Sequence, residues 1–216
     1  MTTKIKNIIF DLGGVILGID EHLTFNELAK AGFSDMGLLK SPKIIDLLSK
    51  FDTGVYTAKT FRKKLKAALN LSKMTDEKFD SIWNAMLFDI PKERIEAIEK
   101  VKKHYRIFLA SNSNEIHYDL YVRDLQLRFG YNEFDELFNK AYFSFDIHLE
   151  KPDPRFFEFI LDHEGLNPEE TLFIDDTAEN IEAAKKLGIK TYHISREELV
   201  RNLFNNGILK EEVAIE

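Results

Sequence analysis

The stretch IIFDLGGVILGID, residues 8–20, joins the pattern of a buried strand to that of a binding loop. Three apolar residues precede a single carboxylate at Asp11, and two glycines follow before the apolar pattern resumes. A short apolar run that ends in a turn is typical of a strand in a parallel sheet, where ligands bind beyond the carboxyl ends. Asp11 therefore lies where a site is expected, although the acid that often follows two residues later is replaced by Gly13.

Similar apolar runs recur along the chain, each followed by a segment of helical period. Strands buried on both faces are expected at residues 6–10, 106–111, 141–145, 171–175 and 190–194. Helices are expected at residues 91–105, 115–129, 154–164, 178–187 and 196–205. Because strands that alternate with helices form parallel sheets with right-handed crossovers, the sequence predicts an α/β fold. Its Rossmann-like parallel sheet has helices on both faces.

The alternation stops between residues 18 and 90, where only helical patterns occur. They cover residues 23–31, 42–50, 58–69 and 76–87, with Ser41 and Thr75 as expected N-caps. A βαβ crossover needs only about 30 residues including its strands. We therefore expect a Rossmann-like core of residues 1–17 and 91–216, with an all-helical domain of residues 18–90 inserted after the first strand.

Composition excludes several classes of function. With 216 residues, 44% of them hydrophobic, the chain can bury a substantial core. A formal charge of -7, with bases scattered among acids, argues against a nucleic-acid partner. The absence of cysteine excludes disulfides and thiolate metal sites. Since no segment has the pattern of a signal peptide or a membrane span, we expect a cytoplasmic protein without a membrane partner; its oligomeric state is not indicated.

Polar groups follow four of the predicted strands. They are Asp11 after the first, Ser111 and Asn112 after the second, Lys151 after the third, and Asp175 with Asp176 after the fourth. Taken singly, these residues have ordinary interpretations as a turn residue, a helix cap, a solvated lysine and an acidic helix start. Their joint position at one edge of the sheet favours a functional site.

The residue types at this edge suggest a ligand. Three carboxylates without histidine or cysteine nearby form an oxygen ligand set suited to Mg²⁺. A hydroxyl and backbone amides at Ser111 and Asn112, which lead into a helix N-terminus, can accept an anion. Lys151 can hold that anion beside a carboxylate. A small phosphorylated metabolite next to Mg²⁺ satisfies all of these groups.

Over nearly its whole length the chain resembles the haloacid dehalogenase superfamily, specifically phosphatases with a helical cap inserted after the first strand. The motifs are FDLGGV (10–15), FDTGVYTAKTFRKKL (51–65), LASNSNEIH (109–117), LEKPDPRFFEFIL (149–161) and FIDDTAENIEAAKKLGI (173–189). The nearest likeness is to the subgroup of α-D-glucose-1-phosphate phosphatase and the phosphatase-like N-terminal domain of soluble epoxide hydrolases. The resemblance implies a Mg²⁺-dependent hydrolase of phosphate monoesters.

The resemblance also implies a nucleophile and a metal site. Asp11 would attack phosphorus and form an aspartyl-phosphate that water then hydrolyses. Asp11 and the backbone carbonyl of Gly13 would bind Mg²⁺ together with the acids of the fourth strand. Asp176 is favoured as the direct ligand and Asp175 as a ligand through water, although the order of the two stays open. Asn180 would steady that water.

For the phosphate, the resemblance implies that Ser111 and the Asn112 amide hold the phosphoryl oxygens. Lys151 would neutralise charge between the phosphate and Asp11, as the electrostatics of phosphoryl transfer requires.

One departure from the pattern concerns the proton donor. Most phosphatases of the superfamily have a second Asp where this chain has Gly13, although the glucose-1-phosphate phosphatase subgroup shares the glycine. General acid catalysis is worth about 10²–10⁴-fold, so its loss favours leaving groups that need little protonation, such as the anomeric oxygen of a sugar 1-phosphate. Asp20, His22 and Asp52 are candidates for the missing acid or base.

Two alternatives remain at this stage. A 2-haloacid dehalogenase of the same superfamily would use the same nucleophile on carbon, but its chemistry needs no metal, and the adjacent Asp175 and Asp176 would repel each other without one. A catalytically silent protein that binds a phosphorylated metabolite would not require the nucleophile Asp11.

Overall fold

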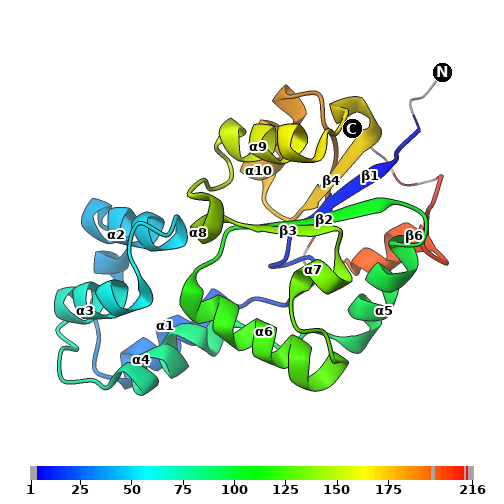
Figure 1. Ribbon diagram of the computed structural model, residues 1–216. Helices are drawn as coiled ribbons and strands as arrows, with labels where there is room; N and C mark the ends of the chain where they lie inside the picture. Colours follow the sequence, from blue (N-terminus) through cyan, green and yellow to red (C-terminus); the bar gives the residue numbers. More distant parts are fainter. Residues whose placement is uncertain (1–3, 196–197, 212, 214–216) are drawn as a thin grey trace.

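The predicted strands pair into one parallel sheet. The computed structural model describes residues 4–195, 198–211 and 213. The strands are β1 (Asn7–Phe10), β2 (Arg106–Ser111), β3 (Lys140–Phe143), β4 (Thr171–Asp175) and β5 (Lys190–His193). Their order across the sheet is β3-β2-β1-β4-β5, and Figure 1 labels the first four of these strands. Because β1 lies between β2 and β4, the ends of these three strands meet at the centre of the sheet, and the predicted fold class is confirmed.

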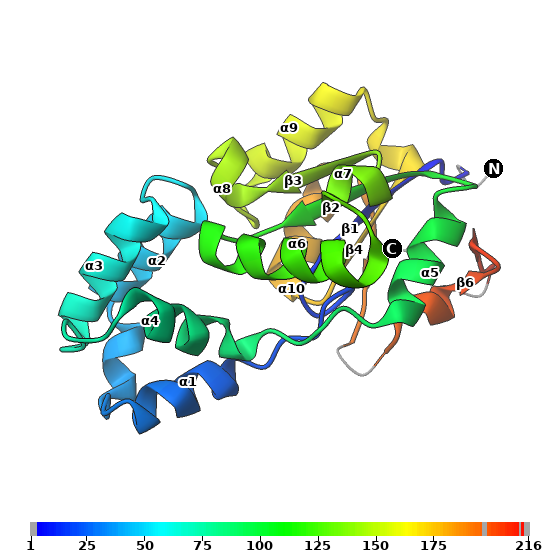
Figure 2. The same cartoon turned by 60° about the horizontal axis from the view of Figure 1, so that its bottom comes forward.

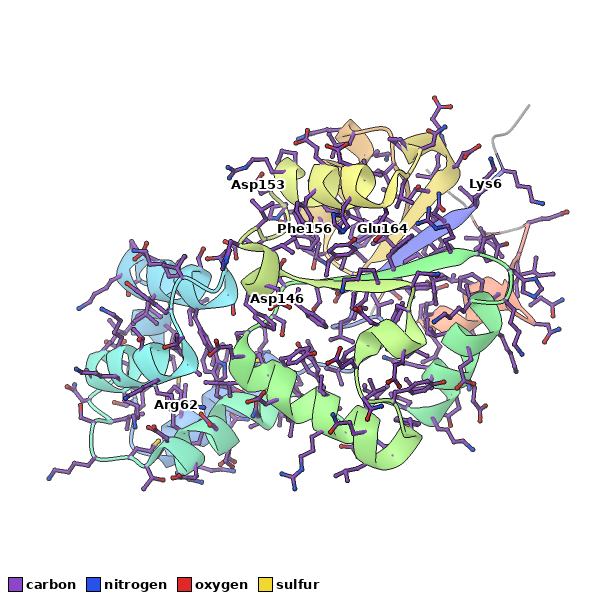
Figure 3. All side chains as sticks on the ribbon, in the orientation of Figure 1. Lys6, Arg62, Asp146, Asp153, Phe156 and Glu164 are labelled. Atoms are coloured by element: carbon purple, nitrogen blue, oxygen red, sulfur yellow. The ribbon has the colours of Figure 1, made fainter. Side chains whose placement is uncertain are left out.

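Each face of the sheet is covered by its own set of helices. Ile8 and Phe10 pack with α5 (Lys92–Val101), α6 (Glu115–Phe129) and α7 (Phe134–Leu137). Ile9, whose side chain alternates to the other face, packs with α9 (Pro154–Glu164) and α10 (Ala178–Lys186). Phe156 of α9, labelled in Figure 3, is fully buried in this second layer.

The edge strands differ from the prediction. β3 ends at Phe143, and residues expected to extend it form the short helix α8 (Ser144–Ile147). In β5 only Thr191 is fully buried, and His193 is exposed. Burial on both faces holds for the central strands, whereas an edge strand has a neighbour on only one side, so the expectation was wrong for β5.

The C-terminal prediction was also wrong. Residues 196 and 197 of the expected helix at 196–205 lie outside the described residues. The rest forms a 3-10 turn, Val200–Leu203, followed by a hairpin of β6 (Phe204–Asn205) and β7 (Ile208–Leu209). Asn206 and Gly207 between the strands both have positive φ, the conformation that a two-residue hairpin turn requires. The Asn-Gly pair therefore favours a hairpin over a helix in this segment.

Between β1 and α5 the chain forms a separate group of helices. They are α1 (Glu21–Lys30), α2 (Pro42–Asp52), α3 (Ala58–Ala68) and α4 (Asp76–Trp83), with 3-10 turns at Met36–Lys40 and Asn84–Met86. Ser41 and Thr75 cap α2 and α4 as predicted. Figures 1 and 2 show the four helices gathered beyond the carboxyl ends of the strands. Their shared hydrophobic cluster includes Ile116 from α6.

The two connections to this helical group run side by side. Ile19 and Leu87 form an antiparallel bridge, and the Phe88 amide donates a hydrogen bond to the Gly18 carbonyl at 3.0 Å. Within the described residues, none of the helices combines the length and the apolar composition that crossing a bilayer requires.

Candidate active site

Asp11, Lys151 and Asp175 form a buried ionic group at the centre of the sheet edge. Because Phe10 pairs with Ile174, the residues that follow, Asp11 and Asp175, leave β1 and β4 side by side. The Lys151 ammonium donates to Asp11 Oδ1 at 2.7 Å and to Asp175 Oδ2 at 2.6 Å. Its side chain is only 1% exposed. One cation thus lies between two carboxylates that the sequence places 164 residues apart.

Burial controls the ionisation of this group. Burial raises the pKa of Asp11 to about 7, the Lys151 ammonium opposes that rise, and the charge of Asp175 adds to it. Burial alone would lower the pKa of Lys151, but the two carboxylates outweigh it and the pKa lies above its usual value. The amine is therefore charged at neutral pH, and further positive charge near Asp11 would favour its carboxylate form.

The two acids at the carboxyl end of β4, Asp175 and Asp176, occupy different environments. Asp175 is fully buried and accepts hydrogen bonds from Lys151, from the Thr177 amide at 2.8 Å and from Asn180 Nδ2 at 3.0 and 3.1 Å. Asn180 therefore contacts the Asp175 carboxylate itself, where the sequence predicted a contact with water. Asp176 is half-buried and lines the cavity above. The sequence had left the order of these two acids open.

The carboxylate oxygens of Asp11, Asp175 and Asp176 converge within 4.8 Å of one another. Such an all-oxygen set fits Mg²⁺, and the single ammonium of Lys151 does not neutralise three carboxylates. Gly14 makes room for the set: it has a φ of 75°, and a Cβ there would lie 2.2 Å from Asp176 Oδ2. Gly13, the other predicted ligand, lines the same cavity.

The predicted anion-binding residues follow β2. Ser111 is 3% exposed and lines the cavity with Asn112. The Asn112 side chain makes a reciprocal pair with the Lys151 backbone: Nδ2 donates to the Lys151 carbonyl at 2.7 Å, and Oδ1 accepts from the Lys151 amide at 2.8 Å. Asn112 thus holds the backbone of Lys151 in place. Sequence reasoning missed this pair because its members lie 39 residues apart.

The loop after β2 is held by three further residues that the sequence did not indicate. The Ser113 amide donates to Ser144 Oγ at 2.9 Å, and Ser144 Oγ donates back to the Ser113 carbonyl at 3.1 Å. The hydroxyls of Ser113 and Tyr121 are hydrogen-bonded to each other. All three are buried, so the loop after β2 is anchored to both α8 and α6.

The position of the missing acid is filled by an apolar side chain. A Cβ on Gly13 would lie 2.4 Å from Ile19 Cδ1. Of the three candidate replacements, Asp20 caps α1 by accepting from the His22 amide at 3.0 Å, and His22 is exposed at the cavity mouth. Asp52 lines the cavity from the end of α2 and accepts from Asn114 Nδ2 at 2.9 Å.

A cavity of about 940 Å³ joins these groups. Its floor carries every predicted site residue except Asp175, which lies beneath the surface. Its opposite wall comes from the helical group and is mainly apolar, with Phe25, Leu28, Ile44, Leu48, Leu65 and Trp83. The polar floor and the mainly apolar wall thus come from different parts of the chain.

Comparison with known proteins identifies the family. Residues 5–188 match the haloacid dehalogenase-like hydrolase family, and the chain belongs to it. D-ribitol-5-phosphate phosphatase of Bacteroides thetaiotaomicron is 29% identical over 189 residues, 87% of this chain and 91% of that protein. (S)-2-haloacid dehalogenase 4A of Burkholderia cepacia is 30% identical over 103 residues, 47% of this chain and 42% of that protein.

Solved structures agree with this assignment. The crystal structure of a haloacid dehalogenase family enzyme from Bacteroides thetaiotaomicron is 30% identical, with a TM-score of 0.86 over 94% of this chain and all of that one. The wild-type form of that enzyme in complex with magnesium and inorganic phosphate has a TM-score of 0.81 at 30% identity, over 93% of this chain and 100% of that one. The expected family is confirmed, and the nearer likeness to glucose-1-phosphate phosphatases stays a prediction.

Proposed function

We propose that the protein is a Mg²⁺-dependent phosphatase that hydrolyses a small phosphorylated metabolite through an aspartyl-phosphate on Asp11. The observation that carries this proposal is the buried group in which one ammonium contacts Asp11 and Asp175 beside Asp176. The relative with a phosphatase name and the similar enzyme that holds magnesium and phosphate support it. A dehalogenase has no need for so many converging carboxylates.

In the proposed reaction Asp11 attacks phosphorus in line with the leaving oxygen. The Ser111 hydroxyl and the Asn112 backbone amide hold phosphoryl oxygens. The Lys151 ammonium, already 2.7 Å from Asp11 Oδ1, neutralises charge that accumulates between nucleophile and phosphate. Water then hydrolyses the aspartyl-phosphate and regenerates the Asp11 carboxylate.

The proposed metal ligands are Asp11, the Gly13 carbonyl and Asp176, with Asp175 acting through a water. Donors from Lys151, Thr177 and Asn180 already engage both oxygens of Asp175, which supports this order. Bound Mg²⁺ supplies positive charge to the phosphoryl oxygens.

We assign the helical residues 18–90 as a cap that covers the cavity and selects the leaving group; they are called the cap below. For the leaving group we favour the anomeric oxygen of a sugar 1-phosphate. This choice rests on Gly13, which has no proton donor, and on Ile19, which fills the space where one would stand. Turnover of phosphate esters with graded leaving-group acidity tests this choice. Equal rates for glycosyl and simple alkyl phosphates would contradict it.

A phosphate-release screen over a broad panel of phosphorylated metabolites tests the proposed activity. We expect release by the wild type with Mg²⁺, none after chelation, and a loss of at least about 10³-fold in Asp11→Asn. No metal-dependent release from any compound would favour a silent binding protein. Release of chloride from a 2-haloacid without Mg²⁺ would favour the dehalogenase.

A further inference from the structure

The proposed reaction lacks a residue that removes a proton from the hydrolytic water. Gly13 has no side chain, and Ile19 occupies the adjoining space. The water must approach phosphorus from the side that the leaving group vacated, opposite Asp11. In the described structure that side of the cavity is formed by the cap, so a base is expected there.

Asp52 is a carboxylate of the cap that lines the cavity and contacts the loop after β2. It ends α2 directly after Phe51, which is 1% exposed and anchored in the cap cluster. Its Oδ1 accepts from Asn114 Nδ2 at 2.9 Å, and Asn114 is the N-cap of α6, only two residues beyond Asn112. A cap carboxylate is therefore hydrogen-bonded to the segment that follows the phosphate-binding residues.

Contacts on both sides of Asp52 hold this part of the cap against the core. Ser49 Oγ donates to Glu150 Oε1 at 2.6 Å, and His148 Nδ1 lies 2.8 Å from the Thr53 carbonyl. Gly54 lies so close to the core that a Cβ there would be 2.1 Å from the Phe145 carbonyl oxygen. Asp52 is thus positioned by neighbours along its own chain and by Asn114 across the cavity.

The electrostatics of the position suit a base. Burial raises the pKa of Asp52 to about 7; the Asn114 hydrogen bond opposes the rise, and the charge of Glu150 adds to it. Burial also raises the pKa of the Tyr121 hydroxyl, and the carboxylates of Asp52 and Asp11 both contribute, so both lie within electrostatic reach of one phenol. Proton transfer is most effective when the pKa of the base is close to the working pH.

Other acids that line the cavity fit this role less well. Glu21 and Glu179 line it but are exposed, and Asp20 is not among the lining residues and caps α1 instead. His22, also exposed, has no contact with the loop after β2 among the described interactions.

We infer that Asp52 is the general base for the second half of the reaction, an inference that rests on the proposed phosphatase function. The water oxygen bonds to phosphorus while its proton passes to the Asp52 carboxylate. The bond between phosphorus and Asp11 breaks, its electron pair returns to the Asp11 carboxylate, and inorganic phosphate leaves. Asp52 then releases the proton to solvent, and the earlier alkoxide leaving group takes its proton from solvent water.

The test separates the two halves of the reaction in Asp52→Asn, with Asp46→Asn on the exposed side of the same helix as the control. Because kcat/KM reports only steps up to loss of the leaving group, we expect kcat/KM to be unchanged in both variants. In Asp52→Asn, kcat and KM should fall together by about 10²–10⁴-fold. Acid quenching during turnover should then trap the phosphorylated enzyme, which the wild type and Asp46→Asn accumulate less.

Two results would overturn the inference. One is an unchanged kcat in Asp52→Asn; the other is an equal fall in kcat and kcat/KM without trapped phosphoenzyme, which indicates a structural role. Asp52→Glu, which retains a carboxylate, should recover most of the lost kcat. That recovery would show that the loss in Asp52→Asn is not caused by misfolding. Failure of the proposed function would be recognised separately, because the wild type would then release no phosphate at all.

Discussion

The core and the cap both line the cavity, but different kinds of contact hold their polar residues in place. In the core, Asp11, Ser111 and Asp175 sit at or just beyond the ends of hydrogen-bonded strands, so backbone pairing fixes their positions. In the cap, Asp52 sits at the end of a helix and depends on side-chain contacts such as that with Asn114. The groups proposed for bond formation are thus held by the sheet. The residues proposed to act on the water and the leaving group lie on the cap, which packs against the core.

The packing of the two regions shows the same contrast. The core has one hydrophobic cluster on each face of the sheet, and both clusters include strand residues. The cap has a separate cluster, to which α6 of the core contributes Ile116. Disturbing the core should therefore affect chemistry and global stability together. Disturbing the cap should affect local stability and later steps of the reaction.

The largest effect is expected from Lys151→Met in the core. It leaves the buried carboxylates of Asp11 and Asp175 without their cation, which costs about 3–5 kcal/mol of stability. It should also lower kcat/KM by at least about 10²-fold. Chemical denaturation without metal, together with steady-state kinetics, measures both. Lys30→Met, at an exposed ion pair in the cap, is the control and should change neither; a similar stability for both variants would contradict the prediction.

The matching change in the cap is Phe61→Ala. Phe61 is fully buried and stacks on Phe51 with ring centroids 3.9 Å apart, so its truncation should cost about 3–5 kcal/mol. We expect amide hydrogen exchange to lose protection in α2, α3 and α4 but not in β1 or β4. Equal loss of protection in the strands would show that the two regions unfold as one.

Metal binding should stabilise the core through Asp176. At a Mg²⁺ concentration 100 times the Kd, binding adds about 2.7 kcal/mol to the unfolding free energy, and thermal melts should show the corresponding rise in Tm. Asp176→Asn should lose most of this rise, whereas Glu179→Gln, an exposed acid in the first turn of the helix that follows, should keep it. A full Mg²⁺ response in Asp176→Asn would contradict the proposed ligand order.

A smaller effect is expected when Asp52→Asn is followed against pH. The pKa of Asp52 is raised from 3.8 in a free chain to about 7 by burial, so the folded protein binds the proton more tightly than the unfolded one. The wild type should therefore lose stability relative to Asp52→Asn as pH rises from about 4 to about 7, at up to about 1.4 kcal/mol per pH unit. Thermal melts at pH 4.5 and pH 8 in a chelator measure the difference. If the stability of the two proteins changed with pH in the same way, the pKa of Asp52 would not be raised in the folded protein.

The core was more predictable from sequence than the cap for a physical reason. Strand periodicity indicates which residues end a strand, and parallel strands place those ends at one edge, so the grouping of Asp11 with Asp175 followed from local patterns. Lys151 was expected there only as a residue that follows the third strand, and in the structure α8 lies between that strand and Lys151. The reciprocal pair between Asn112 and Lys151 and the filling of the Gly13 position by Ile19 did not follow from local patterns, because they depend on how distant loops meet.

Local turn chemistry explains the errors in secondary structure. Ser144 continues an apolar run but turns into α8, where its hydroxyl bonds to the Ser113 backbone. The Asn206-Gly207 pair overrode a helical pattern near the C-terminus. In the cap, the four helices were predicted together with the N-caps of α2 and α4. Asp52 was one of three candidates for the missing acid or base, but its contact with Asn114 could not be predicted, because the two residues lie 62 positions apart.

The most direct measurement is mass spectrometry of the protein acid-quenched during turnover of a phosphate ester with Mg²⁺. The proposed mechanism predicts one added phosphoryl group on the peptide that contains Asp11, absent after chelation and absent in Asp11→Asn. Metal-dependent phosphate release with no phosphoryl group on that peptide, and with activity retained in Asp11→Asn, would contradict it.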